Sequence, residues 1–173
     1  QVVGIKIDLS TDLHPEVFEE YNRLIVSGDV PEEFRNLARE AKLIFDETHD
    51  KVLFQFLHND SHHENIIIKD KKISGIIDFG NAEYGEVAKE FSRYIRDFPG
   101  YFEYIVSAYE KMSGNILSRE RLVSNAFLSG FAEIVEDYGK ENNGREKAIQ
   151  SIEVYRHLID ALKSRRFDTM KLS

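Results

Sequence analysis

The sequence predicts a mostly helical α+β fold with one small antiparallel β element. Apolar residues recur at helical spacing over most of the chain, for example at Tyr21, Leu24 and Ile25. Two isoleucine-rich runs, residues 66–68 and 73–77, flank a polar turn, which is the pattern of a β-hairpin. The length of 173 residues suits one domain with one hydrophobic core.

The helical pattern predicts six helices outside the central region. Pro15 and Pro31 suit the first turn of a helix, because the N–H that proline lacks would have no helical partner there. Ser118 is expected to cap a longer helix that follows it. The expected ranges, in order, are 15–26, 31–45, 86–98, 101–112, 118–139 and 145–162.

The central region is predicted to hold the strands. Residues 52–57 are apolar enough for a buried strand, and the hairpin that follows brings Asn65, at its start, beside Asp78, at its end. We expect a single domain over residues 1–173. It divides into a helical segment at 1–50, a loop-bearing centre at 51–80 and a helical part at 81–173.

Composition excludes several classes of protein. A content of 42% hydrophobic and 31% charged residues is that of a globular protein rather than a disordered one. A net charge of -8 argues against a nucleic-acid partner, and no apolar run approaches the roughly 20 residues that span a bilayer. Residues 1–6 lack the form of a secretory signal, and the absence of Cys excludes disulfides and zinc–thiolate sites. A cytoplasmic location is the expectation.

Two short motifs in the centre indicate the chemistry. Residues 58–65 read HNDSHHEN and residues 77–80 read IDFG. The spacing H-x-D-x-x-x-x-N, followed by D-F-G, is typical of the catalytic and metal-binding loops of kinase-type phosphotransferases. Each half alone is a weak signal, but six fixed residue types in order make coincidence a poor explanation. The motifs predict phosphoryl transfer.

Each motif residue has a chemistry that this reaction needs. A carboxylate must orient the acceptor hydroxyl and take its proton, and we assign this role to Asp60. Mg²⁺ prefers oxygen ligands and is shared with substrate phosphates, so Asn65 and Asp78 are the expected metal ligands. Gly80 allows a sharp turn where a side chain would obstruct. ATP or GTP is the expected phosphate donor.

Residues 56–91 resemble the aminoglycoside phosphotransferase and choline-kinase superfamily. Its catalytic loop usually runs H-G/N-D-L-H-x-x-N and its metal loop I-D-F/W-G, so that His62 falls on the second histidine. The nearest likeness is to the 2''-aminoglycoside phosphotransferases. The resemblance implies the carboxyl-terminal lobe of a protein-kinase-like fold, with Asp60 as base, Asn65 and Asp78 as Mg²⁺ ligands, and His58, His62 and Gly80 in support.

The chain also departs from the family pattern. Ser61 replaces a usual Leu and Glu64 a usual small residue. Residues 86–91 read EVAKEF where the family tends to have D-P-x-x-D-L/F. We expect Glu90 to keep the structural role of the second acid in that pattern.

Two other interpretations remain open for the histidines. His58 is interpreted as a hydrogen-bonded core histidine rather than a substrate ligand. Together with Asp60, His62 and His63 it could instead form a transition-metal cluster, as in binuclear metallohydrolases. Such sites draw further ligands from later in the chain, yet only His157 follows and there is no Cys.

The nucleotide-binding lobe of such enzymes is not recognisable in the sequence. Only 59 residues precede Asp60, and they are filled by two predicted helices and a strand, without a glycine-rich loop. We therefore expect a catalytic lobe without its nucleotide lobe, inactive by itself, which exposes an apolar surface that favours self-association. A non-catalytic module that binds a ligand or a protein is the alternative.

An acidic chain favours a small cationic substrate at long range. Candidate carboxylates for binding it lie in the helices after the metal loop: Asp97, Glu103, Glu133, Glu136 and Asp137. Glu133 and Asp137 share a helix face at i and i+4. The competing interpretation of these acids is a solvated helix surface.

Overall fold

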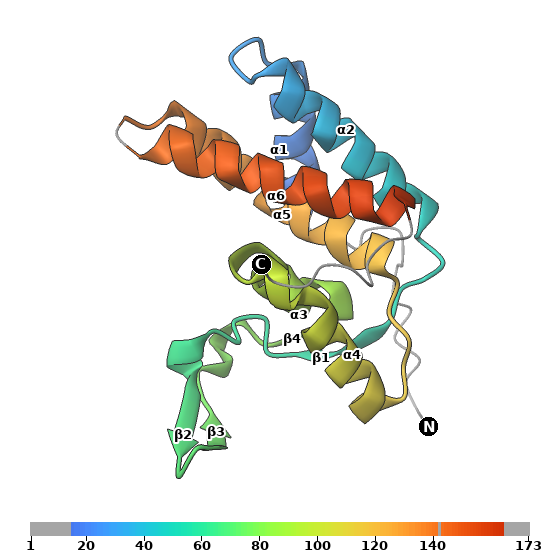
Figure 1. Cartoon of the computed structure of the whole chain (residues 1–173), viewed down its shortest axis with the longest axis vertical. Coiled ribbons are helices and arrows are strands. Elements are labelled where there is room, and N and C mark those ends of the chain that lie inside the picture. Colours follow the sequence, from blue (N-terminus) through green and yellow to red (C-terminus); the bar gives the residue numbers. More distant parts are fainter. Residues whose placement is uncertain (1–14, 142, 165–173) are drawn as a thin grey trace.

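The computed structural model describes residues 15–141 and 143–164 (Figure 1). The amino-terminal residues 1–6 considered above lie outside these ranges. The helices are α1 (Pro15–Val26), α2 (Glu32–Glu47), α3 (Val87–Asp97), α4 (Phe102–Ser113), α5 (Arg119–Gly139) and α6 (Gly144–Ser164). The strands are β1 (Phe54–Leu57), β2 (Ile66–Lys69), β3 (Lys72–Ile76) and β4 (Glu83–Glu86). The mostly helical α+β class is confirmed, whereas the assignment to a kinase-like lobe stays a prediction.

Helix ends follow the signals in the sequence. Ser118 caps α5, because its Oγ accepts a hydrogen bond from the Arg121 N–H at 3.1 Å. Gly114 ends α4 in the left-handed conformation, with φ of 73°. Pro31 is the N-cap of α2 rather than its first residue. None of the described helices is long and apolar enough to cross a bilayer.

Helix α5 lies at the centre of the core. It packs against α2, α3 and α6, and α1 also contacts it. Phe127 of α5 is fully buried and meets Tyr155 of α6 edge-to-face, with ring centroids 5.0 Å apart. In Figure 1 α1, α2, α5 and α6 form one end of the molecule, and α3, α4, β1 and β4 form the part that carries the motif loops.

Strand β1 pairs with a strand that the sequence did not reveal. β1 and β4 form an antiparallel pair in which Leu57 lies opposite Glu83. Residues 83–86 read EYGE and lack the apolar alternation of a strand. They pair with β1 because the backbone N–H and C=O groups of both segments need hydrogen-bond partners. The expected helix at 86–98 consequently starts at Val87. The prediction of a buried strand was wrong: Leu57 is buried, but Phe56 is 68% exposed.

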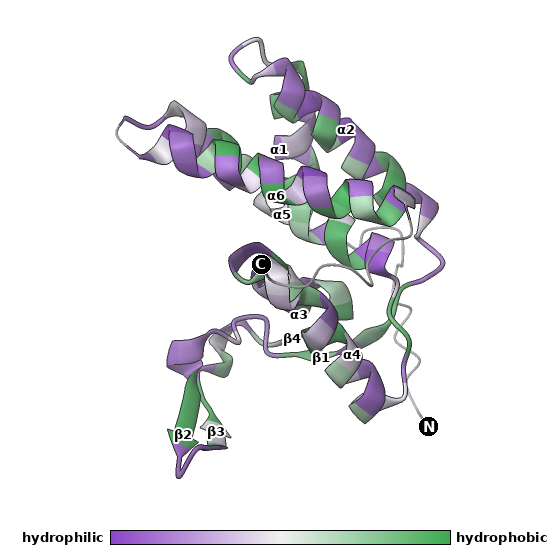
Figure 2. Cartoon of the chain, viewed as in Figure 1, coloured by the Kyte–Doolittle hydropathy of each residue, from purple (hydrophilic) through white to green (hydrophobic). Residues whose placement is uncertain are grey.

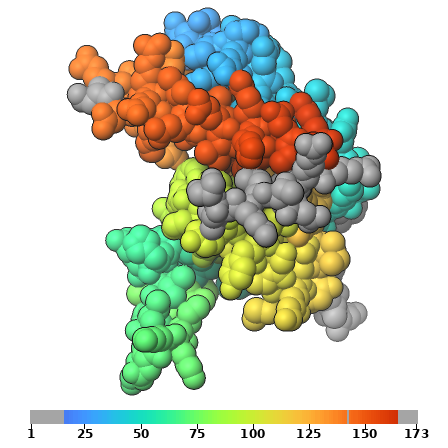
Figure 3. All heavy atoms as spheres, in the orientation of Figure 1, coloured from blue at the N-terminus to red at the C-terminus, as the bar shows by residue number. Residues whose placement is uncertain are grey.

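The second sheet is the hairpin of β2 and β3, which projects from the body in Figure 1 and Figure 3. Asp70 and Lys71 at its tip have φ of 51° and 60°, as a tight primed turn requires. In Figure 2, β2 is strongly apolar, while β3 mixes apolar and polar residues. They are nevertheless largely exposed, with Ile68 at 67% and Ile73 at 66%.

A buried ion pair joins the first sheet to the helices. Arg121 of α5 donates to both carboxylate oxygens of Glu86, at 2.6 and 2.9 Å, and to the carbonyl of Phe45 in α2 at 2.8 Å. Its guanidinium also stacks 3.6 Å from the centroid of the Phe45 ring. Glu86, at the end of β4, is thereby held against α5 and α2.

Candidate active site

His58 ties the two motif loops together just after β1. Its Nε2–H donates to the carbonyl of Ile77 at 2.8 Å, while its Nδ1 accepts from the Asp60 N–H at 3.3 Å. A carbonyl oxygen can only accept, so Nε2 is the donor and Nδ1 the acceptor in this arrangement. The ring also packs edge-to-face on Phe79, at 4.5 Å between centroids. His58 is hydrogen-bonded as expected, and it is half-buried rather than fully in the core.

Asn65 lies between Asp60 and the metal loop. Its Nδ2 donates to the carbonyl of Asp60 at 2.9 Å, and its own carbonyl accepts from the Ile77 N–H at 3.0 Å. The side chain is buried, and its Oδ1 makes no hydrogen bond within the described residues. The hairpin therefore brings Asn65 next to the residue that precedes Asp78, as its spacing predicted.

Asp78 is in the left-handed conformation, with φ of 61° and ψ of 63°. The residue is exposed, so its carboxylate carries no penalty of burial. Its carboxylate makes no hydrogen bond or ion pair with the described part of the chain. A Cβ on Gly80 would lie 3.3 Å from Asp78 Oδ1, so glycine keeps the space around this carboxylate open.

Helix α3 holds residues 58–65, the predicted catalytic loop, from one side. Glu90 accepts hydrogen bonds from the Asn59 N–H, at 2.9 Å, and from the Ser61 hydroxyl. The Tyr94 hydroxyl donates to the carbonyl of Ser61. Ser61 and Glu90 both depart from the pattern described above, and the two departures contact each other. Glu90 is half-buried and binds this loop, and its equivalence to the second acid of the family stays a prediction.

Arg93 of α3 is a functional candidate that the sequence did not suggest. Its Nη1 donates to Asp60 Oδ1 at 2.9 Å, and His62 Nε2 lies 3.7 Å from the same oxygen. Asp60 Oδ2 has no partner within the described residues. The pairing links residues 33 positions apart, so only a signal of tertiary contact could have found it.

The transition-metal alternative finds no support in this geometry. No group of three or more His, Cys, Asp and Glu side chains in the described ranges is arranged to hold a metal ion. His62 lies near two acids, Asp60 at 3.7 Å and Glu64 at 3.6 Å, while His58 is directed at a backbone carbonyl. His58 and His62 therefore face different partners and do not converge on one metal position.

A comparison with known families gives a match, and this match covers both motif loops. The family model described as the phosphotransferase enzyme family (APH) matches residues 11–121, well over half of the chain and all of the loop region. The chain belongs to this phosphotransferase family. No curated protein and no solved structure gave a match. Phosphotransferase activity in general thus follows from the family, and the narrower likeness to 2''-aminoglycoside enzymes stays a prediction.

Three of the predicted substrate acids of this phosphotransferase meet at one cavity. Asp97, Glu133 and Asp137 line a space of about 210 Å³ between α3, α5 and α6. Arg96 bridges two of them, at 3.0 Å to Asp97 and 2.8 Å to Glu133. Hydrogen bonds from Lys140 and Lys147 lower the pKa of Asp137 below its ordinary value. All three acids thus already face cations of the chain.

The other two predicted acids lie outside that cavity. Glu136 is exposed and pairs with Lys140 at 3.0 Å. Glu103 of α4 pairs with Arg119 of α5 at 3.1 Å. The structure therefore gathers Asp97, Glu133 and Asp137 and leaves Glu136 and Glu103 apart.

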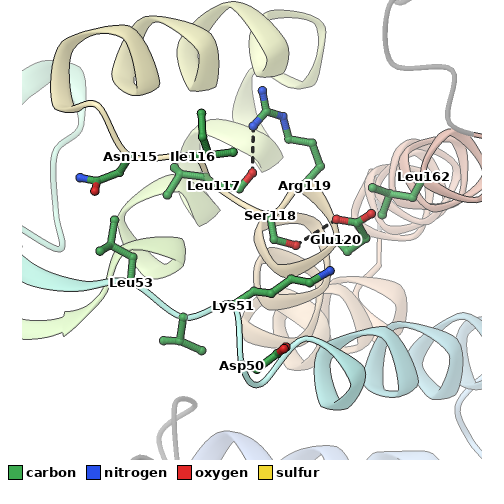
Figure 4. Close-up of a pocket in the computed structure, with 11 residues that line it drawn as sticks. Asp50, Lys51, Leu53, Asn115, Ile116, Leu117, Ser118, Arg119, Glu120 and Leu162 are labelled. Atoms are coloured by element: carbon green, nitrogen blue, oxygen red, sulfur yellow. Dashed lines mark hydrogen bonds between the residues drawn. The ribbon is translucent and has the colours of Figure 1, made fainter.

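A larger cavity, of about 730 Å³, lies away from the motif loops (Figure 4). It is lined by the segment between α2 and β1, the segment between α4 and α5, the first two residues of α5, and Leu162 of α6. Figure 4 shows Ser118 and Arg119 at its edge, each bonded to a neighbouring residue of the chain. Neither Asp60, Asn65 nor Asp78 lines it, so cavity size does not mark the chemistry here.

Proposed function

We propose that this phosphotransferase transfers the γ-phosphate of ATP or GTP to a hydroxyl of a small cationic, aminoglycoside-like acceptor, with Mg²⁺. The observation that carries the proposal is the bonding of Asn65 to both loops: its side chain binds the Asp60 carbonyl, and its carbonyl binds the Ile77 N–H. One residue thereby couples the proposed base to the proposed metal ligand, Asp78.

Asp60 is the proposed general base. Its Oδ1 is engaged by Arg93, and its Oδ2 is available to an acceptor hydroxyl. A base must come within about 3 Å of the proton that it takes. The half-buried position of the side chain, 25% exposed, is compatible with such an approach.

The donor set fits Mg²⁺. Asn65 offers an amide oxygen, Asp78 an exposed carboxylate, and both are hard oxygen ligands of the kind that this ion prefers. Mg²⁺ bound there would neutralise charge on the donor phosphates. Two protein ligands are typical of sites in which phosphates and water complete the shell.

A cationic acceptor suits the three acids that line the cavity between α3, α5 and α6. The three carboxylates around the 210 Å³ cavity are neutralised by Arg96, Lys140 and Lys147, and an acceptor ammonium group would compete with these cations. The net charge of -8 supports attraction at longer range. Asp97 also lies 3.6 Å from Arg93 Nε, which contacts the proposed base.

Binding of the nucleotide, the phosphate donor, needs further groups besides the elements that the structure describes. In the described part of the chain ahead of Asp60 the elements are α1, α2 and β1, and no lysine there contacts Asp78. We therefore expect no measurable phosphotransfer from the 173-residue chain alone. Multiple turnovers with that chain, at a rate lost in Asp60→Asn, would contradict this expectation.

The test is Asp60→Asn in the naturally expressed protein. With labelled ATP or GTP, Mg²⁺ and an aminoglycoside acceptor, turnover should fall by about 10²–10⁴-fold, as loss of a general base does. Asp29→Asn, an exposed acid before α2, is the matched control and should keep full activity. Near-normal turnover in Asp60→Asn would exclude Asp60 as the base.

A further inference from the structure

Helix α3 directs one face at the catalytic loop. Glu90, Arg93, Tyr94 and Asp97 are spaced i, i+3, i+4 and i+7, which places them on one side of the helix. Glu90 and Tyr94 bind the loop next to Asp60, through the Asn59 N–H, the Ser61 hydroxyl and the Ser61 carbonyl. Arg93 is the member of this face that contacts the Asp60 side chain.

Arg93 binds only one of the two carboxylate oxygens of Asp60. Arg93 Nη1 lies 2.9 Å from Asp60 Oδ1, and Oδ2 has no partner in the described ranges. Because the backbone around Asp60 is already held by α3 and Asn65, the torsions of the side chain are what Arg93 controls. A carboxylate held by one oxygen presents the other in a defined direction.

Arg93 is itself held in place by a chain of ion pairs. Its Nε lies 3.6 Å from Asp97 Oδ2, and Arg96 binds the other oxygen of Asp97 at 3.0 Å. Arg96 in turn binds Glu133 of the central helix α5 at 2.8 Å. A planar guanidinium can face two carboxylates with different nitrogens, which the single ammonium of a lysine does less well.

We propose that Arg93 is a positioning residue that orients the base Asp60 toward the acceptor hydroxyl. The inference rests on the proposed function. Arg93 is 45% exposed and Asp60 25%, and an ion pair exposed to that degree contributes little to stability. Its removal should therefore change turnover much more than folding.

The first test is Arg93→Gln in the naturally expressed protein. We expect kcat to fall by about 10–100-fold, the size of effect that a misplaced catalytic group produces, with an unchanged KM for the nucleotide. Arg93→Lys should recover part of the loss. Arg156→Gln is the control, because Arg156 is 43% exposed and pairs with Glu33 far from the loops. Wild-type kcat in Arg93→Gln would overturn the proposal.

A double variant separates this proposal from the proposed function. If Arg93 acts through Asp60, Asp60→Asn combined with Arg93→Gln should be no slower than Asp60→Asn alone. If the two losses multiply, Arg93 acts independently and the positioning role is wrong. If Asp60→Asn alone keeps normal turnover, the assignment of the base fails first.

A measurement that needs no activity completes the test. In the 173-residue chain, NMR couplings of Asp60 should report one χ1 rotamer, since staggered rotamers are resolved by such couplings. In Arg93→Gln the rotamers should become averaged, and in Arg156→Gln they should stay as in the wild type. An unchanged single rotamer in Arg93→Gln would overturn the proposal whatever the enzyme assay gives.

Discussion

Two residues of the candidate site adopt a backbone conformation that most residues avoid. Asn59 and Asp78 both have φ of 61°, one in each motif loop. The left-handed region costs an ordinary residue roughly 1–2 kcal/mol, and Asn and Asp are the non-glycine types that tolerate it best. Hydrogen bonds from neighbouring elements hold these turns: Glu90 accepts from Asn59, and Ile77, beside Asp78, bonds to Asn65 and His58.

The two proposed metal ligands should respond differently to removal. In the naturally expressed protein, Asn65→Ala and Asp78→Ala should both raise the Mg²⁺ concentration needed for half-maximal turnover. Asn65→Ala should also lower the free energy of unfolding by about 1 kcal/mol, because a buried bond to the Asp60 carbonyl is lost. Asp78→Ala should not, since this carboxylate is exposed.

A Mg²⁺ titration of activity and a urea titration of the folded chain measure these effects. Asp70→Ala, at the exposed hairpin tip, serves as the control for the titration of activity. If both variants keep the Mg²⁺ dependence of the wild type, neither residue is a ligand.

At the scale of the elements, α3 organises the site more than the hairpin does. The hairpin delivers Asn65 and Asp78, but the catalytic loop is held by side chains of α3. The start of α3 is in turn set by β4, whose last residue, Glu86, is anchored by Arg121. The position of the proposed base therefore depends on the packing of α3 against α5.

Glu90→Ala tests this dependence on α3. The variant removes the acceptor of both the Asn59 N–H and the Ser61 hydroxyl. We expect a loss of about 1.5–3 kcal/mol of unfolding free energy, as for hydrogen bonds to a charged group, together with reduced turnover. Glu90→Gln, which keeps one acceptor oxygen, should lose less.

Chemical denaturation compares these variants with Glu19→Ala on the exposed side of α1, which should be neutral. Equal stability of Glu90→Ala and Glu19→Ala would mean that Glu90 does not hold the loop.

At the scale of the whole molecule, several polar contacts join the helical body to the motif-bearing part, and the pair of Arg121 with Glu86 is buried. The Arg121 guanidinium links β4, α5 and α2 in one place, with side chains that are 3% and 2% exposed for Arg121 and Glu86. A buried pair is weak support for net stability, but removal of one partner is costly because the other charge stays buried. The pair specifies how the two parts meet.

Arg121→Met should lower the free energy of unfolding by about 3–5 kcal/mol, since the Glu86 carboxylate would lose its guanidinium in the interior. Arg156→Met, which breaks the exposed pair with Glu33, should cost no more than about 1 kcal/mol. Thermal and urea unfolding of both variants give the comparison. Similar losses in the two would show that burial of the Glu86 pair has no special role.

The projecting hairpin should cause self-association of the chain. Ile66 and Ile76 lie opposite each other, as do Ile68 and Ile73, so that one face of the hairpin is lined with isoleucine. Exposed apolar surface of this kind promotes association. In sedimentation experiments the average mass should rise with concentration, and Ile68→Thr with Ile73→Thr should abolish the rise.

Val26→Thr, at an equally exposed site on α1, should leave the association unchanged. A chain that stays monomeric at high concentration would contradict the prediction.

The sequence by itself determined the helices, the hairpin and the motif residues. Helix spacing, Pro and Gly positions and the N-cap Ser118 are local signals that can be read within one element. The proposed roles of Asp60, Asn65 and Asp78 likewise come from residue type and order. The hairpin predicted the approach of Asn65 to Asp78 because that contact is also local.

Only the tertiary structure decided the rest. Strand β4 has no local signal, and its pairing with β1 shifted the start of α3 and left Phe56 exposed. The contact of Arg93 with Asp60 and that of Arg121 with Glu86 join residues more than 30 positions apart. Such contacts depend on how helices pack, and packing is a property of the whole core that no short stretch of residues encodes.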